Sequence, residues 1–114
     1  MALRNARTGA IVASALEPAF ESATRNRGLL GRETLAPGHA LVIAPSNLVH
    51  TFFMRFALDL IFVSRRGDVV KIRTAVPRSR IVGALRAFAV VEMNAGSLAG
   101  LDLVPGDRLE LATL

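Results

Sequence analysis

Cysteine is absent from this 114-residue chain, which excludes a disulfide framework, a thiolate zinc site and a cysteine nucleophile. Tryptophan and tyrosine are absent too, and most of the six phenylalanines stand in core-like positions. Proteins that bind single-stranded nucleic acid stack the bases on exposed aromatic side chains, so we do not expect that function. No stretch approaches the roughly 18 apolar residues of a membrane-spanning helix, and we expect a soluble protein without a membrane span.

The residue groupings that mark common cofactor and catalytic sites are also missing. The two histidines, His39 and His50, have no close run of carboxylates at metal-ligand spacing. No nucleophile elbow surrounds Ser46 or Ser64. The segment 28–31 lacks the spacing and the preceding strand of a phosphate-binding loop. We therefore expect no metal and no cofactor, and a non-enzymatic function is favoured over an enzymatic one.

What the chain has in abundance is apolar residues, 52% of the total, enough to offset chain entropy in one core. Its length predicts a single domain, residues 1–114. Arg4 and Arg7 precede a short apolar run, residues 9–16, which imitates a secretory signal but ends at Glu17. We interpret the run as a first β-strand and expect a cytoplasmic protein, with a secreted or periplasmic protein as the alternative.

Short apolar segments separated by proline and glycine turns predict strands through most of the chain. The alternation of Phe52, Met54 and Phe56 predicts a strand over 49–56, and Gly67 suits a hairpin turn. The predicted strands are 11–16, 39–44, 49–56, 58–63, 69–73, 87–93 and 108–111, with one short helix within 22–30. The prediction is a mainly β fold, a small barrel or a two-sheet sandwich of about six to eight short strands with one short helix near the N-terminus.

Two charged residues, Arg55 and Asp59, stand inside the most apolar part of the chain. A buried group without a partner costs several kcal/mol, so Asp59 must find an arginine, backbone donors or water. Arg55 is the nearest candidate if the chain bends at 56–57. Two interpretations remain open: a buried Arg55–Asp59 pair that fixes strand register, or a polar patch on the floor of a pocket beside His50.

The formal net charge is +5, and all basic residues except Lys71 are arginines. No acidic residue occurs between Asp68 and Glu92, a stretch that contains five cations. A solvated face explains such a run, and an anion-binding face is the functional alternative. The residues of this candidate face are Lys71, Arg73, Arg78, Arg80 and Arg86.

Several motifs, in order along the chain, resemble the bacterial and archaeal domain of unknown function 192 (DUF192), also called UPF0127. The matching residues are 27–32 (RGLLGR), 38–41 (GHAL), Pro45, 50–56 (HTFFMRF), Leu58, Asp59, Glu92, Gly96 and 105–107 (PGD). The resemblance covers nearly the whole chain from about Ile11. Relatives usually have proline where this chain has Ala57, and many have cysteine where it has Ser46. The resemblance implies a compact β-rich domain and no settled activity.

The leading hypothesis is a non-enzymatic binding module for a small molecule or anionic group, because large apolar side chains converge with few polar ones in typical ligand pockets. The candidate ligand-binding residues are His50, Phe53, Met54, Arg55, Asp59 and Arg32. One alternative is a small enzyme with His50 as base and Arg55 as anion-binding group, which requires both side chains in one cleft. The other is a basic interaction domain that docks on acidic protein or nucleic acid through the Lys71–Arg86 face.

Overall fold

The computed structural model describes all residues, 1–114, and contains ten β-strands and one short helix. The elements in chain order are β1 (Ala2–Asn5), β2 (Ile11–Ala13), β3 (Ala15–Ala19), α1 (Ser22–Arg27), β4 (His39–Ile43), β5 (Leu48–His50), β6 (Leu58–Val63), β7 (Val69–Val76), β8 (Ile81–Gly83), β9 (Ala89–Asn94) and β10 (Leu109–Ala112).

The strands form three sheets. The largest has five strands in the order β3-β4-β9-β6-β7, and only its β3–β4 pair is parallel. A three-stranded antiparallel sheet has the order β10-β1-β2, and β5 pairs with β8 in a separate two-stranded ribbon. Strand β9 is therefore the middle strand of the large sheet, which places its side chains in the centre of the molecule.

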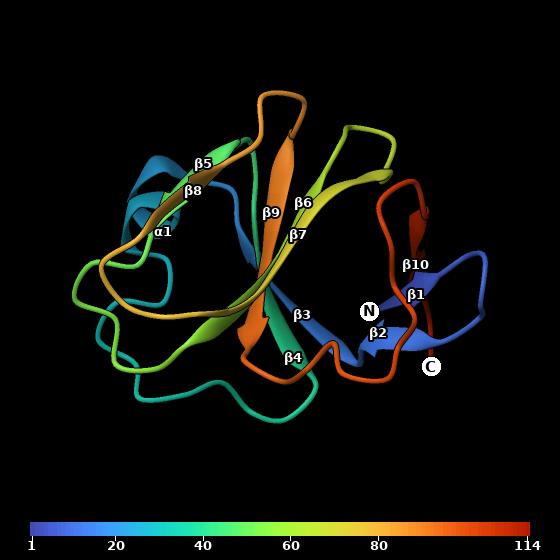
Figure 1. Ribbon diagram of the computed structural model, residues 1–114, viewed down its shortest axis with the longest axis horizontal. Helices are drawn as coiled ribbons and strands as arrows, with labels where there is room; N and C mark the ends of the chain where they lie inside the picture. Colours follow the sequence, from blue (N-terminus) through green and yellow to red (C-terminus); the bar gives the residue numbers. More distant parts are fainter.

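The large sheet separates two apolar cores, the first containing Ile61 and the second Phe62. This sheet lies in the middle of the molecule in Figure 1. In this view the three-stranded sheet lies to the right of the large sheet, whereas β5, β8 and α1 lie to the left. Because successive residues of a strand point to opposite faces, Ala89, Val91 and Met93 face the first core, and Val90 faces the second. The residues of β6, all buried, are divided in the same way.

The structure confirms a mainly β fold, and its stacked sheets correspond to the sandwich rather than to a closed barrel. The predicted strand over residues 58–63 is present unchanged as β6. At the hairpin that follows, Gly67 has φ +87°, and a Cβ there would lie 2.5 Å from the carbonyl oxygen of Leu109. The structure contains no helix long and apolar enough to cross a membrane.

The predicted strand over 49–56 is wrong beyond His50. The chain turns at once: the amide of Met54 donates to the carbonyl of Thr51, and Phe53 has φ +64°. The buried hydroxyl of Thr51 donates to the carbonyl of Pro77 and accepts from the amide of Arg80, which anchors this turn to the β7–β8 loop. The apolar alternation therefore arises from a loop that buries Met54 and exposes its neighbours, not from a pleated strand.

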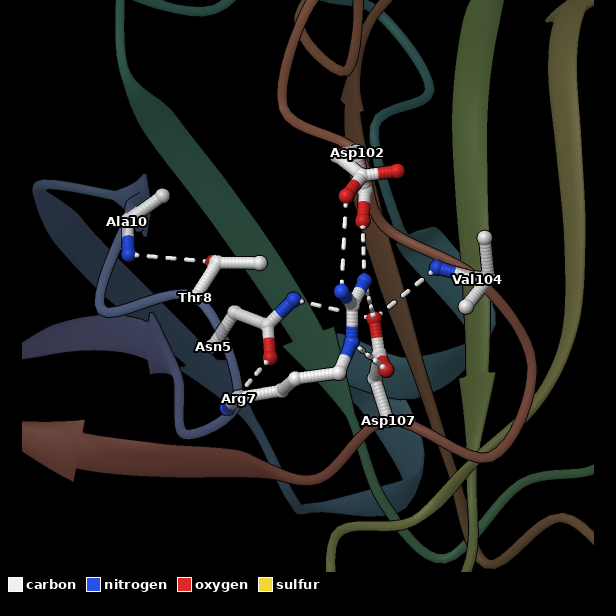
Figure 2. A network of polar contacts seen from close by, with 7 residues as sticks. All are labelled: Asn5, Arg7, Thr8, Ala10, Asp102, Val104 and Asp107. Atoms are coloured by element: carbon white, nitrogen blue, oxygen red, sulfur yellow. Dashed lines mark hydrogen bonds and ion pairs between the residues drawn. The ribbon is translucent and has the colours of Figure 1, made fainter.

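The sequence pattern also fails to predict β1, because its four residues show no clean alternation. Near the C-terminal end of the chain, the buried carboxylate of Asp107 holds the turn after β1 in place (Figure 2). Asp107 accepts hydrogen bonds from Nε and Nη2 of Arg7 at 2.6 and 3.0 Å, from Nδ2 of Asn5 and from the amide of Val104. These contacts fix the N-terminal turn against the loop before β10.

These donors, Arg7 above all, hold the pKa of Asp107 well below its ordinary value of 3.8. A lowered carboxyl pKa stabilises the fold above the ordinary value, and this stabilisation is lost as the pH falls below it. We expect Asp107→Asn to lower the melting temperature at pH 7, and the gap from the wild type to narrow progressively below about pH 4. Melting curves followed by circular dichroism between pH 2 and 7 measure both; a gap that is constant with pH would contradict the assignment.

Candidate functional site

A pocket of about 460 Å³ opens on the face of the large sheet that carries the second core, between the C-terminal end of α1 and strand β5. We call it the Glu92 pocket. Its lining residues are Arg25, Asn26, Arg27, Gly28, Leu29, Leu30, Ile43, Pro45, Ser46, Leu48, Val49, His50, Met54 and Glu92.

Glu92 is the one acidic side chain in this pocket. It stands on the middle strand β9, directly between Leu41 of β4 and Leu60 of β6, and is only 4% exposed. Its carboxylate makes no hydrogen bond and no ion pair with any other residue, and because no sealed side-chain oxygen in this structure lacks a partner, its oxygens reach the solvent in the pocket. Burial raises the pKa of Glu92 to about 7, because the charged form loses its hydration and gains no partner.

The end of α1 lies beside this carboxylate, and its backbone conformation there favours glycine. Gly28 has φ +49°, a conformation that other residues rarely adopt, and its amide closes the helix on the carbonyl of Thr24. A Cβ built at Gly28 would lie 3.7 Å from Oε1 of Glu92. The backbone of the RGLLGR segment thereby forms one wall of the pocket.

The mouth of the pocket is polar and basic. The guanidinium of Arg27 makes no hydrogen bond and no ion pair within the chain, whereas that of Arg25 donates to the carbonyl of Phe20 and to the hydroxyl of Ser22. His50 and Ser46 also line the pocket, and the Ser46 hydroxyl donates to the carbonyl of Leu48.

This arrangement can bind a small polar molecule. With a pKa near pH 7, Glu92 can donate a hydrogen bond when protonated and accept one when ionised. Arg27 supplies a free cation for an anionic group, and buried leucine and methionine side chains provide the apolar walls. A largely buried carboxylate whose oxygens meet only the solvent of a concavity, and whose pKa is raised by burial, is a feature of binding sites.

The structure brings together only two of the residues predicted from the sequence as ligand-binding, His50 and Met54. Phe53 is 85% exposed and Arg55 is exposed; neither lines the pocket. Arg55 pairs with Glu33 at 3.4 Å. The enzyme alternative requires His50 and Arg55 in one cleft, and they do not share this one.

Arg32 lies outside the pocket as well. Its Nη1 atom donates to Oε2 of Glu17 at 2.7 Å, and the two side chains are each 39% exposed. Both residues border a separate hollow beside β3. The arginine after the RGLLG turn therefore ties that turn to the edge strand of the large sheet.

Asp59 is buried, as the sequence indicates, and its partners are backbone donors, one of the three kinds expected from the sequence; the candidate pair with Arg55 is not formed. Its carboxylate accepts the backbone amides of Ala75 at 2.9 Å and of Gly96 and Leu98 at 3.1 Å. Asp59 pairs with Met93, whose side chain lies in the first core, so it belongs to the opposite face of the sheet from Glu92. Backbone donors compensate this charge, and Arg55 takes no part.

None of the five residues of the candidate anion-binding face forms an ion pair with a carboxylate. Lys71 donates to the carbonyl of Gly83, Arg73 to that of Ile72, and Arg80 to those of its neighbours in the loop. Their positive charge is therefore not neutralised within the chain.

The residues missed by sequence reasoning are Glu92 itself, Gly28, Arg25, Arg27 and Ser46. The signal that singles out Asp59 also exists for Glu92: an ionisable residue inside an apolar strand, here AVVEM. The position of Arg27 and Gly28 beside Glu92 has no such signal, because 64 residues separate Gly28 from Glu92 along the chain.

The comparisons with known proteins agree with this fold. No curated protein matches the chain. A crystal structure from Sinorhizobium meliloti 1021, described as a proposed transcription regulator, is similar with a TM-score of 0.80 and 25% identity over 96% of this chain and 89% of that one. A protein of unknown function from Novosphingobium aromaticivorans DSM 12444 is similar with a TM-score of 0.81 and 24% identity over 96% and 82%.

The match to a protein-family model is more specific than these structural similarities. The DUF192 model, described as Uncharacterized ACR, COG1430, matches residues 3–111. The match includes the motifs from the RGLLGR turn to the PGD turn, and residues 27–30 of the first motif line the Glu92 pocket together with Glu92. The chain therefore belongs to the DUF192 family.

Proposed function

We propose that this protein is a binding module for a small polar molecule, which occupies the Glu92 pocket. The observation that carries the proposal is the buried carboxylate of Glu92, which has no partner within the chain and faces a concavity. Because this carboxylate has lost most of its hydration and has no partner in the chain, a ligand that offers it a hydrogen-bond donor gains a strong interaction.

The charges around the pocket narrow the chemistry of the ligand. Glu92 at the floor favours an amine or another donor, and Arg27 at the mouth favours a carboxylate or phosphate. A molecule that carries both groups satisfies both side chains at once. We therefore favour a small ligand with a donor group at one end and an anionic group at the other, of which free amino acids are the simplest examples.

A thermal-shift assay with three matched sets of probes tests this proposal: free amino acids, the amines that lack their carboxylate, and the acids that lack their amine. A ligand that binds only the folded state raises the melting temperature by mass action. We expect a rise with at least one amino acid that exceeds the rise with either matched half. No shift with any probe of the three sets would contradict the proposal.

Two variants with matched controls locate the site. Glu92→Gln and Arg27→Gln are each expected to weaken binding about tenfold or more, the range for one charge-assisted hydrogen bond. Glu21→Gln and Arg55→Gln remove the same charges from exposed positions outside the pocket and should leave the affinity unchanged. Equal losses in the variants and in their controls would show that net charge, not the pocket, determines binding.

A further inference from the structure

A second concavity lies on the opposite face of the large sheet, between that sheet and the three-stranded sheet. Its volume is about 600 Å³, within the range of small-molecule sites. One wall comes from Leu3, Leu109 and Leu111 of β1 and β10, and the other from Leu16, Val42 and Val91 of the large sheet. We call it the apolar groove.

Large apolar side chains remain exposed along this groove. Met1 is 69% exposed, Phe20 58% and Leu111 60%, and all three line it. A contiguous apolar surface in contact with water is unfavourable, and in soluble domains such a surface marks a binding region. The groove is recessed between two sheets, so a slender chain can enter it more readily than the flat face of another protein.

One end of the groove is strongly basic. Arg65 and Arg66, on the β6–β7 turn, line this end, and the guanidinium of Arg65 lies 4.4 Å from the centre of the Phe88 ring. Neither arginine forms an ion pair with a carboxylate. Arg86 borders the adjoining hollow together with them.

The acid beside these arginines is already engaged. Asp68 accepts a hydrogen bond from Nε of Arg108 at 3.1 Å, so it does not neutralise Arg65 or Arg66. An anion that binds this end must therefore come from outside the chain. Apolar walls that lead to unneutralised guanidinium groups are complementary to a molecule with an apolar chain and an anionic head.

We propose that the apolar groove binds a single-chain anionic amphiphile, a fatty acid in the simplest case, with its chain between the two sheets and its carboxylate at Arg65 and Arg66. This site is separate from the Glu92 pocket, because the two concavities occupy opposite faces of the large sheet. The proposal is independent of the function proposed for Glu92.

Calorimetric titration with octanoate, decanoate and dodecanoate, each below its micelle concentration, tests the apolar part. Affinity should rise about fourfold for each methylene that the groove takes up. Dodecylammonium, with the same chain and the opposite charge, should bind at least tenfold more weakly than dodecanoate. Equal affinity for the two head groups, or no dependence on chain length, would overturn the proposal.

The double variant R65Q/R66Q tests the head-group contact. It should weaken dodecanoate binding about tenfold and leave dodecanol binding unchanged, because the alcohol carries no charge. The control R78Q/R80Q removes two charges from residues that do not line the groove and should retain the wild-type affinity. Loss of affinity in the control alone, or equal loss in both double variants, would overturn the assignment to Arg65 and Arg66.

Two further variants test whether dodecanoate binds in the groove rather than elsewhere on the protein. Val42→Phe enlarges a side chain on the groove wall, and Leu111→Gln makes the exposed rim polar; both should weaken dodecanoate binding several-fold. Melting curves establish that each variant is folded, and Leu111→Gln provides the test if Val42→Phe is not. Binding to phosphatidylglycerol vesicles without binding to monomeric dodecanoate would overturn the proposal in favour of a membrane surface.

Discussion

At pH 8, Glu92→Gln is expected to increase the free energy of unfolding by about 3 kcal/mol relative to the wild type. Burial raises the pKa of Glu92 from 4.5 to about 7, so the folded state holds a proton that the unfolded state has already released. A difference of this size corresponds to about 3 kcal/mol of lost stability above pH 7. Glutamine has nearly the same volume and no charge, which removes this loss.

The pH dependence of the free energy of unfolding tests the burial of Glu92 more sharply than the difference at pH 8 alone. The wild type should lose stability as the pH rises from 4.5 to 7 and change little from this group above pH 7, because both states are then ionised. The Glu92→Gln variant lacks this decline, so urea unfolding at pH 4.5 and at pH 8 should give a small difference at the lower pH and a large one at the higher.

Glu21→Gln, at an exposed position, is the matched control and should follow the wild type at both pH values. Parallel curves for the wild type and Glu92→Gln would mean that the carboxylate at position 92 is hydrated. In that case the pocket would have no unpaired buried acid, and the main support for the proposed function would be lost.

Asp59→Ala is expected to destabilise the fold by about 4 kcal/mol. The carboxylate of Asp59 is 1% exposed and satisfies three backbone amides, those of Ala75, Gly96 and Leu98. Alanine removes all three acceptor contacts and leaves these amides, of which that of Leu98 is buried, without this partner, at a cost of about 1–3 kcal/mol for each amide that water does not reach. Urea unfolding at pH 7 measures the loss.

Asp59→Asn should have a smaller effect, about 2 kcal/mol, because one side-chain oxygen remains an acceptor while the new amide group faces an N–H donor. Glu33→Ala removes an acid whose side chain is 84% exposed, and its effect should stay below about 1 kcal/mol. A loss for Asp59→Ala no greater than that for Glu33→Ala would show that these amides find other partners.

The two acids therefore have opposite expected effects although both stand in apolar strands. Asp59 is compensated by donors of the chain itself, so its removal destabilises the fold. Glu92 has no such donor, so its removal stabilises the fold, which is the usual relation between stability and function at a binding site. The comparison of the two variants separates a structural acid from a candidate ligand-binding acid.

Much of the fold follows from local pattern. The strand over 58–63 is predicted correctly because a strand covered on both faces must be apolar throughout, and the Gly67 hairpin because its turn requires positive φ. The turn after His50 is not predictable in this way. Its side chains alternate as in a strand, and only the contacts of Thr51 with Pro77 and Arg80 show that the chain leaves the sheet there.

The candidate site is less predictable than the fold. His50 and Met54 are found by residue type, whereas Arg27 and Gly28 reach the same pocket only because α1 ends beside β9. The same is true of β1, which has little strand character of its own and forms through pairing with β10 at the other end of the chain.

The sequence by itself determined that this chain is mainly β and of the DUF192 type, with ionisable groups inside its apolar strands that need compensation. Only the tertiary structure decided which group is compensated: Asp59 by amides up to 39 residues away, and Glu92 by nothing within the chain. The reason is physical. Residue type fixes the cost of burying a charge, but the donors that offset it come from segments whose proximity depends on the packing of the whole sheet.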